Sequence, residues 1–294
     1  MKNIKIGFIG FGEASYLISQ GLNEEGVQDI IAFDVNQNHD QLGDRINERA
    51  MELNIELKPN LKELITNADI IINATSAKFA LSVAEEALPH LTSEDIYLDF
   101  NAGSPMDMEK ISELFEGKTN FVDVAVVESI PKFKHQVPLL LSGKGAEKFR
   151  QIAIEIGMNV EVVSDDAGKS SAIKLIRSIF MKGFTMLLLE TLSASEKYKI
   201  YDYILNSIEN SITKTSLEET ANLLITRTAT HAERRVAEMS AVIDTLDGMN
   251  VNSKMSEATK EKLEDIVNSD IGQYFVDEEP KDYKEIIDKI NNKN

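Results

Sequence analysis

The sequence of 294 residues contains no cysteine, which excludes disulfides, thiolate nucleophiles and cysteine-ligated zinc. It has four histidines, and they lie far apart along the chain without the spacing of metal ligands. We therefore expect no metal site. Positive charge is also in deficit, because the formal net charge is −18. Since contacts to phosphate need a basic face, we expect neither a nucleic-acid partner nor an anionic membrane surface.

Long apolar runs are absent as well, and the longest, around 186–189, is too short to span a bilayer. The chain enters a strand-like segment at once, without the pattern of a signal peptide, so we expect a cytoplasmic protein. Hydrophobic residues make up 43% of the chain, which is enough for the cores of one large or two ordinary domains.

The first 164 residues alternate strand-like and helix-like segments. Strands are expected at 4–9, 29–34, 69–74, 95–100, 120–127, 137–142 and 159–163. Helices are expected between them, at 13–25, 38–53, 60–67, 77–88, 105–116 and 145–157. Short apolar strands alternating with helices are typical of an α/β fold with a doubly wound, mostly parallel sheet of the Rossmann type. Such sheets bind ligands at the carboxyl ends of their strands.

After Asp165 the strand signals end, and the pattern predicts an all-α C-terminal domain. Residues 167–197 form one long helical segment, interrupted only by Gly183 and apolar on almost every side. Further helices are expected at 200–212, 216–225, 228–247 and 255–267. We therefore divide the chain into domains 1–164 and 165–294. A helix that is apolar all round is buried, so we expect this one to pack also on a second subunit, in a homodimer formed through the C-terminal helices.

A glycine turn follows the first strand, in the sequence Gly10-Phe11-Gly12-Glu13-Ala14. Gly10 permits a sharp turn, and Gly12, which has no Cβ, lets a pyrophosphate approach the backbone. A helix that begins near Glu13 directs its free N–H groups and its positive dipole end toward that phosphate. This pattern predicts a dinucleotide site that includes Phe11 and Ala14.

Asp34 lies 24 residues after Gly10, about where a carboxylate accepts hydrogen bonds from the adenosine ribose. Its charge would repel a 2′-phosphate, and residues 35–38 contain no arginine or lysine to bind one. We therefore expect NAD as the cofactor, with NADP possible. Ser76 and Asn101 follow two later strands, so we expect them on the nicotinamide side of the site.

The start of the long helix contains several charged residues. Lys174, Arg177 and Ser178 share one helix face, and Lys182 borders it. A lysine cation is costly to bury, so we expect the pKa of Lys174 to fall, which suits proton transfer. The alternative is a set of surface lysines on a solvated edge, which we favour for Lys169 and leave open for Lys182.

Three of the seven arginines fall within nine residues: Arg227, Arg234 and Arg235. His231, Arg234, Arg235 and Glu238 share one helix face. Because guanidinium groups bind carboxylate and phosphate in a bidentate manner, one interpretation is an anion clamp for a substrate. The other is a structural salt-bridge face formed with neighbouring glutamates.

These motifs resemble the β-hydroxyacid dehydrogenase superfamily, which includes 3-hydroxyisobutyrate and 6-phosphogluconate dehydrogenases. The family motif Gly-x-Gly-x-x-x-Lys-x-x-Asn-Asn matches at Gly168 and Lys174, with Ser170 in place of the second glycine. Arg177 and Ser178 replace the asparagines. The segment 123–129 is similar to the family's substrate loop without its glycines. The segments 137–143, 174–183 and 231–239 resemble a branch with an uncharacterised phosphogluconate-dehydrogenase-like C-terminal domain.

The resemblance implies hydride transfer between a nicotinamide and the carbinol carbon of a small hydroxy acid, with Lys174 as the catalytic acid or base. Residues that bind or orient the substrate would then be Ser129, Arg177, Ser178 and Lys182, with His231 and Arg234 as weaker candidates for its acidic tail. An arginine at 177 suggests that the substrate is anionic. Three alternatives stay open: an imine or keto-acid reductase, an oxidative decarboxylase of a sugar acid, and a non-catalytic dinucleotide-binding sensor.

Overall fold

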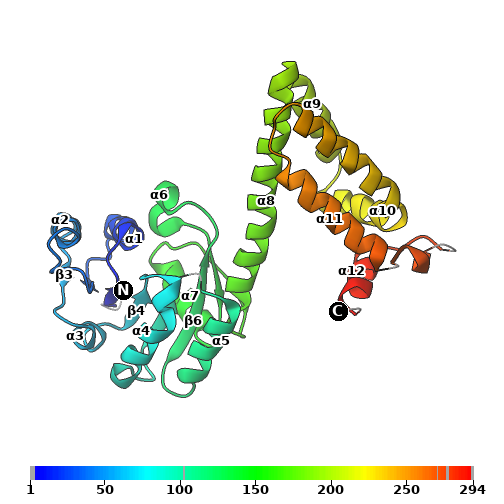
Figure 1. Ribbon diagram of the computed structural model, residues 1–294. Helices are drawn as coiled ribbons and strands as arrows, with labels where there is room; N and C mark the ends of the chain where they lie inside the picture. Colours follow the sequence, from blue (N-terminus) through cyan, green and yellow to red (C-terminus); the bar gives the residue numbers. More distant parts are fainter. Residues whose placement is uncertain (1–3, 102, 270, 276–277, 293–294) are drawn as a thin grey trace. The chain divides into compact units, whose positions relative to one another are not determined.

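The computed structural model describes residues 4–101, 103–269, 271–275 and 278–292, which form two compact units (Figure 1). The first unit, 1–179, holds a sheet with helices, and the described part of the second, 180–294, is helical. The division falls within one long helix, whereas the change of pattern along the sequence lies at 164–165. The predicted fold class, a doubly wound sheet followed by a helical region, is confirmed.

The sheet of the first unit has eight strands in the order β3-β2-β1-β4-β5-β6-β7-β8. Their bounds are Ile6–Ile9, Ile30–Phe33, Glu56–Leu57, Ile70–Asn73, Ile96–Asp99, Asn120–Val126, Leu139–Ser142 and Val160–Ser164 for β1 to β8. All pairs are parallel except β6 and β7, which are antiparallel. The strand order reverses between β1 and β4, and such a point is where doubly wound sheets bind ligands.

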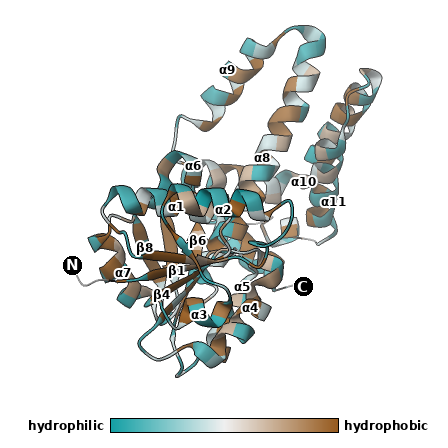
Figure 2. Cartoon of the chain, turned by 90° about the vertical axis from the view of Figure 1, so that its left-hand side faces the viewer, coloured by the Kyte–Doolittle hydropathy of each residue, from teal (hydrophilic) through white to brown (hydrophobic). Residues whose placement is uncertain are grey.

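Helices cover both faces of this sheet. The helices α1 (Glu13–Glu24), α2 (Gly43–Glu52) and α7 (Ala146–Glu155) pack on one face. The helices α3 (Leu61–Ile65), α4 (Ala80–Ala87) and α5 (Pro105–Leu114) pack on the other. Successive strand residues point to opposite faces, so apolar strands buried on both sides supply both cores. Figure 2 shows this layer of hydrophobic strands between helices that are hydrophilic on their outer sides.

The long predicted helix is α8 (Lys169–Tyr198), which begins in the first unit. The second unit continues with α9 (Tyr201–Ile212), α10 (Leu217–Gly248), α11 (Lys254–Asn268) and α12 (Tyr283–Asn291), the last of which the sequence did not predict. The two helices predicted at 216–225 and 228–247 are joined in α10. The backbone of α10 leaves helical geometry at His231, with φ −130° and ψ 25°.

The apolar surface of α8 is not buried within one chain. Ile176, Ile179 and Leu189 are 65%, 74% and 60% exposed. The expectation of burial on most sides is therefore not met by the chain alone. Among the described helices, none is both long and apolar enough to cross a membrane.

Candidate functional site

The glycine turn between β1 and α1 is sterically constrained at Gly10 and open at Gly12. Gly10 has φ +85°, and a Cβ there would lie 2.8 Å from the carbonyl oxygen of Ala74, so the turn needs glycine. Gly12 is exposed, and a Cβ added to it would have open space on all sides. Gly12 is the N-cap of α1 and supplies no side-chain cap, so the first N–H groups of the helix are left for a ligand.

The residues around the turn hold it against the sheet. Ser15 is fully buried, and its hydroxyl donates to the carbonyl oxygen of Gly10 over 2.7 Å. The small, buried Ser15 side chain thus holds the start of α1 against the turn through a hydrogen bond. Phe11 is buried in the core beneath the turn, while Glu13 is exposed and Ala14 half-buried at the start of α1.

Asp34 follows β2 and is oriented toward the same turn. One carboxylate oxygen accepts the N–H of Phe11 over 2.8 Å, and the other accepts the N–H of Asn36 over 2.8 Å. Each oxygen has a further lone pair, so both can still accept from a ribose hydroxyl. The carboxylate therefore stands fixed beside the glycine turn, where a dinucleotide would need it.

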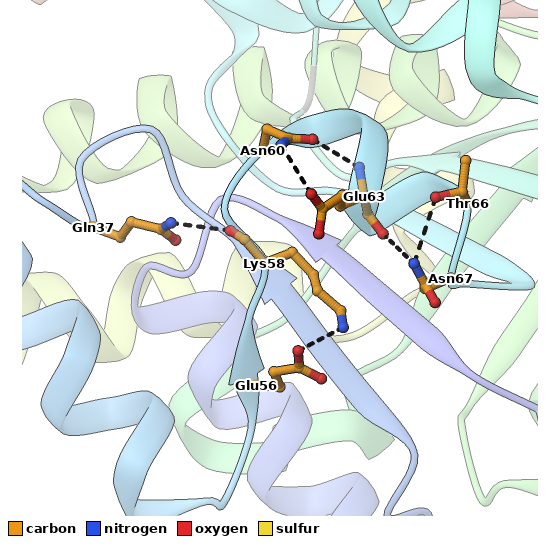
Figure 3. A network of polar contacts seen from close by, with 7 residues as sticks. All are labelled: Gln37, Glu56, Lys58, Asn60, Glu63, Thr66 and Asn67. Atoms are coloured by element: carbon orange, nitrogen blue, oxygen red, sulfur yellow. Dashed lines mark hydrogen bonds and ion pairs between the residues drawn. The ribbon is translucent and has the colours of Figure 1, made fainter.

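A network of polar contacts braces the neighbouring edge of the sheet (Figure 3). Gln37 donates from its side-chain amide to the carbonyl oxygen of Lys58 over 3.0 Å. The ammonium of Lys58 lies 2.6 Å from a carboxylate oxygen of Glu56, and the Lys58 side chain is 13% exposed. Asn60 caps α3 by accepting the N–H of Glu63 over 2.9 Å. The lysine close to the Asp34 loop is therefore already paired with a carboxylate.

A second buried network lies at the carboxyl ends of β4 and β5. Asp99 accepts hydrogen bonds from the side chain of Asn73 over 3.1 Å and from the N–H and side chain of Asn101 over 2.9 and 3.0 Å. Thr75 donates to Asn73 over 2.9 Å. Burial raises the pKa of Asp99 to about 6. Asn101 is half-buried within this network, while Ser76 is exposed at the start of a short helical turn.

A third network joins the start of α8 to the sheet through Asp123, a fully buried residue of β6. Its carboxylate accepts four hydrogen bonds: from the N–H groups of Gly168 and Ser171 over 3.0 and 3.2 Å, and from the hydroxyls of Ser142 and Ser171 over 3.0 and 2.6 Å. A carboxylate is favourable at a helix N-terminus because of the helix dipole. Asp123 thus anchors the helix that carries Lys174.

The predicted reactive face of α8 begins one turn later. Lys174 and Ser178 are half-buried, and Arg177 is exposed. Arg177 donates to the carbonyl oxygen of Val127 over 2.9 Å, and its guanidinium lies 3.7 Å from the Glu128 carboxylate. Because Val127 directly follows β6, this part of α8 stands at the carboxyl edge of the sheet.

Ser129 lies in the same loop, two residues after Val127, and is exposed at the N-cap of the short helix α6 (Ile130–Phe133). Three other predicted substrate-binding residues belong to the second unit. Lys182 and His231 are exposed there, and Arg234 pairs with Glu238 over 3.4 Å. Across the described ranges, no group of three or more metal-ligating side chains is gathered.

Sequence reasoning missed the buried carboxyl group of Asp99 and its partner Asn73. It included Asp123 only in the segment similar to a substrate loop, whereas Asp123 lies buried within β6. A signal for them exists, because each is a polar residue next to a run of apolar strand residues. Asp99 and Asp123 are also register partners on neighbouring strands, and the charge of Asp123 contributes to the raised pKa of Asp99.

Known proteins resemble both parts of the chain. Residues 1–126 match the family described as shikimate/quinate 5-dehydrogenase, and residues 196–266 match a domain of unknown function, DUF1932. An uncharacterised 28.5 kDa protein of Methanothermus fervidus is 28% identical over 264 residues, which are 90% of this chain and 99% of that protein.

Solved structures extend the resemblance. A conserved protein of unknown function, described as structurally similar to 3-hydroxyacid dehydrogenases, is 29% identical and has a TM-score of 0.62, covering 90% of this chain and 98% of its own. An imine reductase from Myxococcus stipitatus in complex with NADP⁺ shares the fold, with a TM-score of 0.71 at 15% identity over 91% of this chain and 96% of its own. The chain therefore combines a dehydrogenase and reductase fold with a C-terminal DUF1932 segment, and the resemblance expected from its sequence is confirmed at this level.

Proposed function

We propose that the protein is an NAD(P)-dependent oxidoreductase that transfers hydride between a nicotinamide and a small anionic hydroxy acid, with Lys174 as general acid and base. One observation carries the proposal. The open glycine turn with Asp34, and the turn of α8 that bears Lys174 and Arg177, belong to one compact unit and stand at the carboxyl edge of its sheet. Doubly wound sheets bind dinucleotide and substrate at this edge.

The residues of the first unit fit a dinucleotide. The N–H groups at the start of α1 and the open space at Gly12 would receive the pyrophosphate, and the Asp34 carboxylate would accept from the adenosine ribose. Ser76 and Asn101 would lie toward the nicotinamide. NAD is the preferred form in this proposal, because the Asp34 charge repels a 2′-phosphate and Lys58 is already paired with Glu56.

When bound, the nicotinamide accepts or supplies the hydride. Lys174 would take the hydroxyl proton during oxidation, or donate a proton to the carbonyl oxygen during reduction. Arg177 has five N–H donors, more than its contacts to Val127 and Glu128 use, so it can also bind a substrate carboxylate. Ser129 and Ser178 would orient the substrate, and Lys182, His231 and Arg234 stay candidates for its acidic end.

A cofactor and substrate screen tests this function against its alternatives. Thermal shifts with NADH and NADPH report dinucleotide binding, because a ligand that binds the native state alone raises stability by RT ln(1 + [L]/Kd). Hydroxy acids, keto acids and imines are then assayed in both directions, with CO₂ release measured for sugar acids. Turnover of hydroxy acids supports the proposal. Turnover of imines alone would indicate an imine reductase, and CO₂ release would indicate an oxidative decarboxylase. Tight NADH binding without any turnover would indicate a non-catalytic sensor.

We also propose that the protein is a homodimer formed through its C-terminal helices. The exposed Ile176, Ile179 and Leu189 of α8 are large apolar side chains on one element, which is typical of an interaction surface. A second copy of the chain would remove them from water. In light scattering, the wild type and a Met51→Glu control on α2 should have the dimer mass, and Ile179→Glu should shift toward monomer. A monomeric wild type at micromolar concentration would contradict the proposal.

A further inference from the structure

The second unit contains a pocket between α10 and α11 with a volume of about 440 Å³. Two arginines of α10, Arg234 and Arg235, line it together with Lys262 of α11. Its lining also includes Thr228 and one carboxylate, that of Glu238. Within the described lining, three cations therefore face one anion, in a chain whose overall charge is strongly negative.

The three cations differ in how far they are already neutralised. Arg234 lies 3.4 Å from Glu238, and Lys262 lies 3.8 Å from Asp265, with both pairs largely exposed. Exposed pairs of this kind contribute little and exchange readily. Arg235 is half-buried and forms no ion pair with the described carboxylates. A partly buried guanidinium carries a charge that water does not fully solvate, so it favours an anionic partner.

Thr228 orients this arginine. The Arg235 guanidinium donates to the Thr228 hydroxyl oxygen over 2.8 Å, and the same hydroxyl donates to the carbonyl oxygen of Leu224 over 2.7 Å. The hydroxyl proton is therefore already used, and Thr228 acts on Arg235 as an acceptor. The remaining N–H donors of Arg235 are left for a ligand.

The break in α10 lies beside this pocket, and its residues line a neighbouring cavity that shares Arg234 with it. His231 lies one turn before Arg235 and has non-helical backbone angles, so a new helical segment begins at Ala232. The N-terminal end of a helical segment carries a partial positive charge. Thr226 and Thr230 donate to carbonyl oxygens three or four residues earlier, a contact that bends helices.

We propose that this pocket binds a small anion with two or more negative charges, of the phosphate or polycarboxylate class. Arg235 would supply the central bidentate contact, and Arg234 and Lys262 would supply flanking charges. The site lies within the helical unit and does not depend on the dinucleotide. Its occupant is either a free anion or the anionic group of a larger substrate.

Calorimetric titration of the full chain with inorganic phosphate tests this site. In the proposed function the glycine turn would also bind phosphate, so all proteins carry Gly12→Glu, which the open space at that position accommodates. At constant ionic strength we expect one phosphate per chain. Arg235→Gln should weaken it roughly 10–100-fold, the usual worth of a lost hydrogen bond to a charged group. Lys262→Gln should weaken binding less, and Lys260→Gln, a control on the same helix outside the pocket, should not change it.

Two results would overturn the proposal: no saturable phosphate binding by a folded protein, or equal affinities for Arg235→Gln and Lys260→Gln. If Arg235→Gln fails to fold, Arg235→Lys keeps the charge without the planar fork and should still weaken binding. Once a substrate is known, its binding can be measured in the presence of phosphate. If phosphate competes with the substrate, the pocket binds the substrate's anionic group. If phosphate binds without competing, the pocket binds a separate anion. The titration needs no turnover, so it stands apart from the redox assay.

Discussion

Replacing Asp123 by alanine should destabilise the first unit more than the same replacement of a carboxylate on the surface. The Asp123 side chain is fully buried and accepts hydrogen bonds from two backbone N–H groups and two serine hydroxyls. Hydroxyls can rotate to new partners. The Ser142 hydroxyl, for example, already lies 2.9 Å from the hydroxyl of Ser170, which could accept its hydrogen bond. The N–H groups of Gly168 and Ser171 cannot turn away, so both would lose their acceptor.

The magnitude follows from those two groups. A buried donor left without a partner costs about 1–3 kcal/mol, so Asp123→Ala should lower the free energy of unfolding by roughly 2–6 kcal/mol. That is a large share of the ~5–15 kcal/mol that stabilises a typical domain. The matched control is Asp69→Ala, because Asp69 is exposed and accepts the N–H of Lys5 over 2.8 Å, a donor that water can satisfy. Its cost should be about 0.5 kcal/mol or less.

Urea unfolding gives the free energies, and native-state hydrogen exchange reports the Gly168 and Ser171 amides separately. Exchange at these two amides should accelerate in Asp123→Ala and stay unchanged in Asp69→Ala. If both variants lose the same small amount of stability and protection, Asp123 does not anchor α8, and the reasoning is refuted.

Three further results are expected. Because burial raises the Asp99 pKa to about 6 from 3.8, the folded state holds this proton more tightly, so its contribution to stability is present at low pH and is lost as pH rises between about 4 and 6. In urea unfolding, the free energy of unfolding of the wild type should fall by about 3 kcal/mol relative to that of Asp99→Asn as the pH rises over that range. A difference between the two proteins that does not change with pH would contradict the raised pKa of Asp99. Gly10→Ala should lower the melting temperature, whereas Gly12→Ala should leave it unchanged; equal melting temperatures would argue against the strained turn. Asp34→Ala should weaken NADH binding roughly tenfold and reduce the preference of the protein for NADH over NADPH. If the ratio of the Kd values for NADPH and NADH does not change, Asp34 does not contact the ribose.

Much of the fold was predictable from local pattern. The apolar strands buried on both faces alternate with amphipathic helices, so their positions along the first 164 residues follow from periodicity. The glycine turn was also predictable from the sequence, because Gly10 adopts a backbone conformation and a close contact that few other residues tolerate, and Gly12 follows it at the spacing of a dinucleotide-binding turn. The two-residue strand β3 was missed, since a segment that short has no periodicity, and α12 was missed in a charged C-terminal segment.

Other features depend on contacts distant in sequence. The antiparallel direction of β7 leaves no trace in its residues, because an apolar strand is the same in either direction. The apolar surface of α8 predicts burial, yet the chain alone does not cover Ile176 and Ile179. The roles of Asp99 and Asp123 arise from neighbouring strands and from the start of α8, which lie tens of residues away.

In the proposed reaction, Lys174 exchanges the proton of a substrate bound beside the nicotinamide. Its most direct test compares Lys174→Met with Lys169→Met, an exposed lysine on the same helix, in steady-state turnover and NADH binding. We expect Lys174→Met to lower kcat by a factor of about 10²–10⁴ while the Kd for NADH stays unchanged, and we expect Lys169→Met to change neither. Full turnover by Lys174→Met would contradict this role of Lys174.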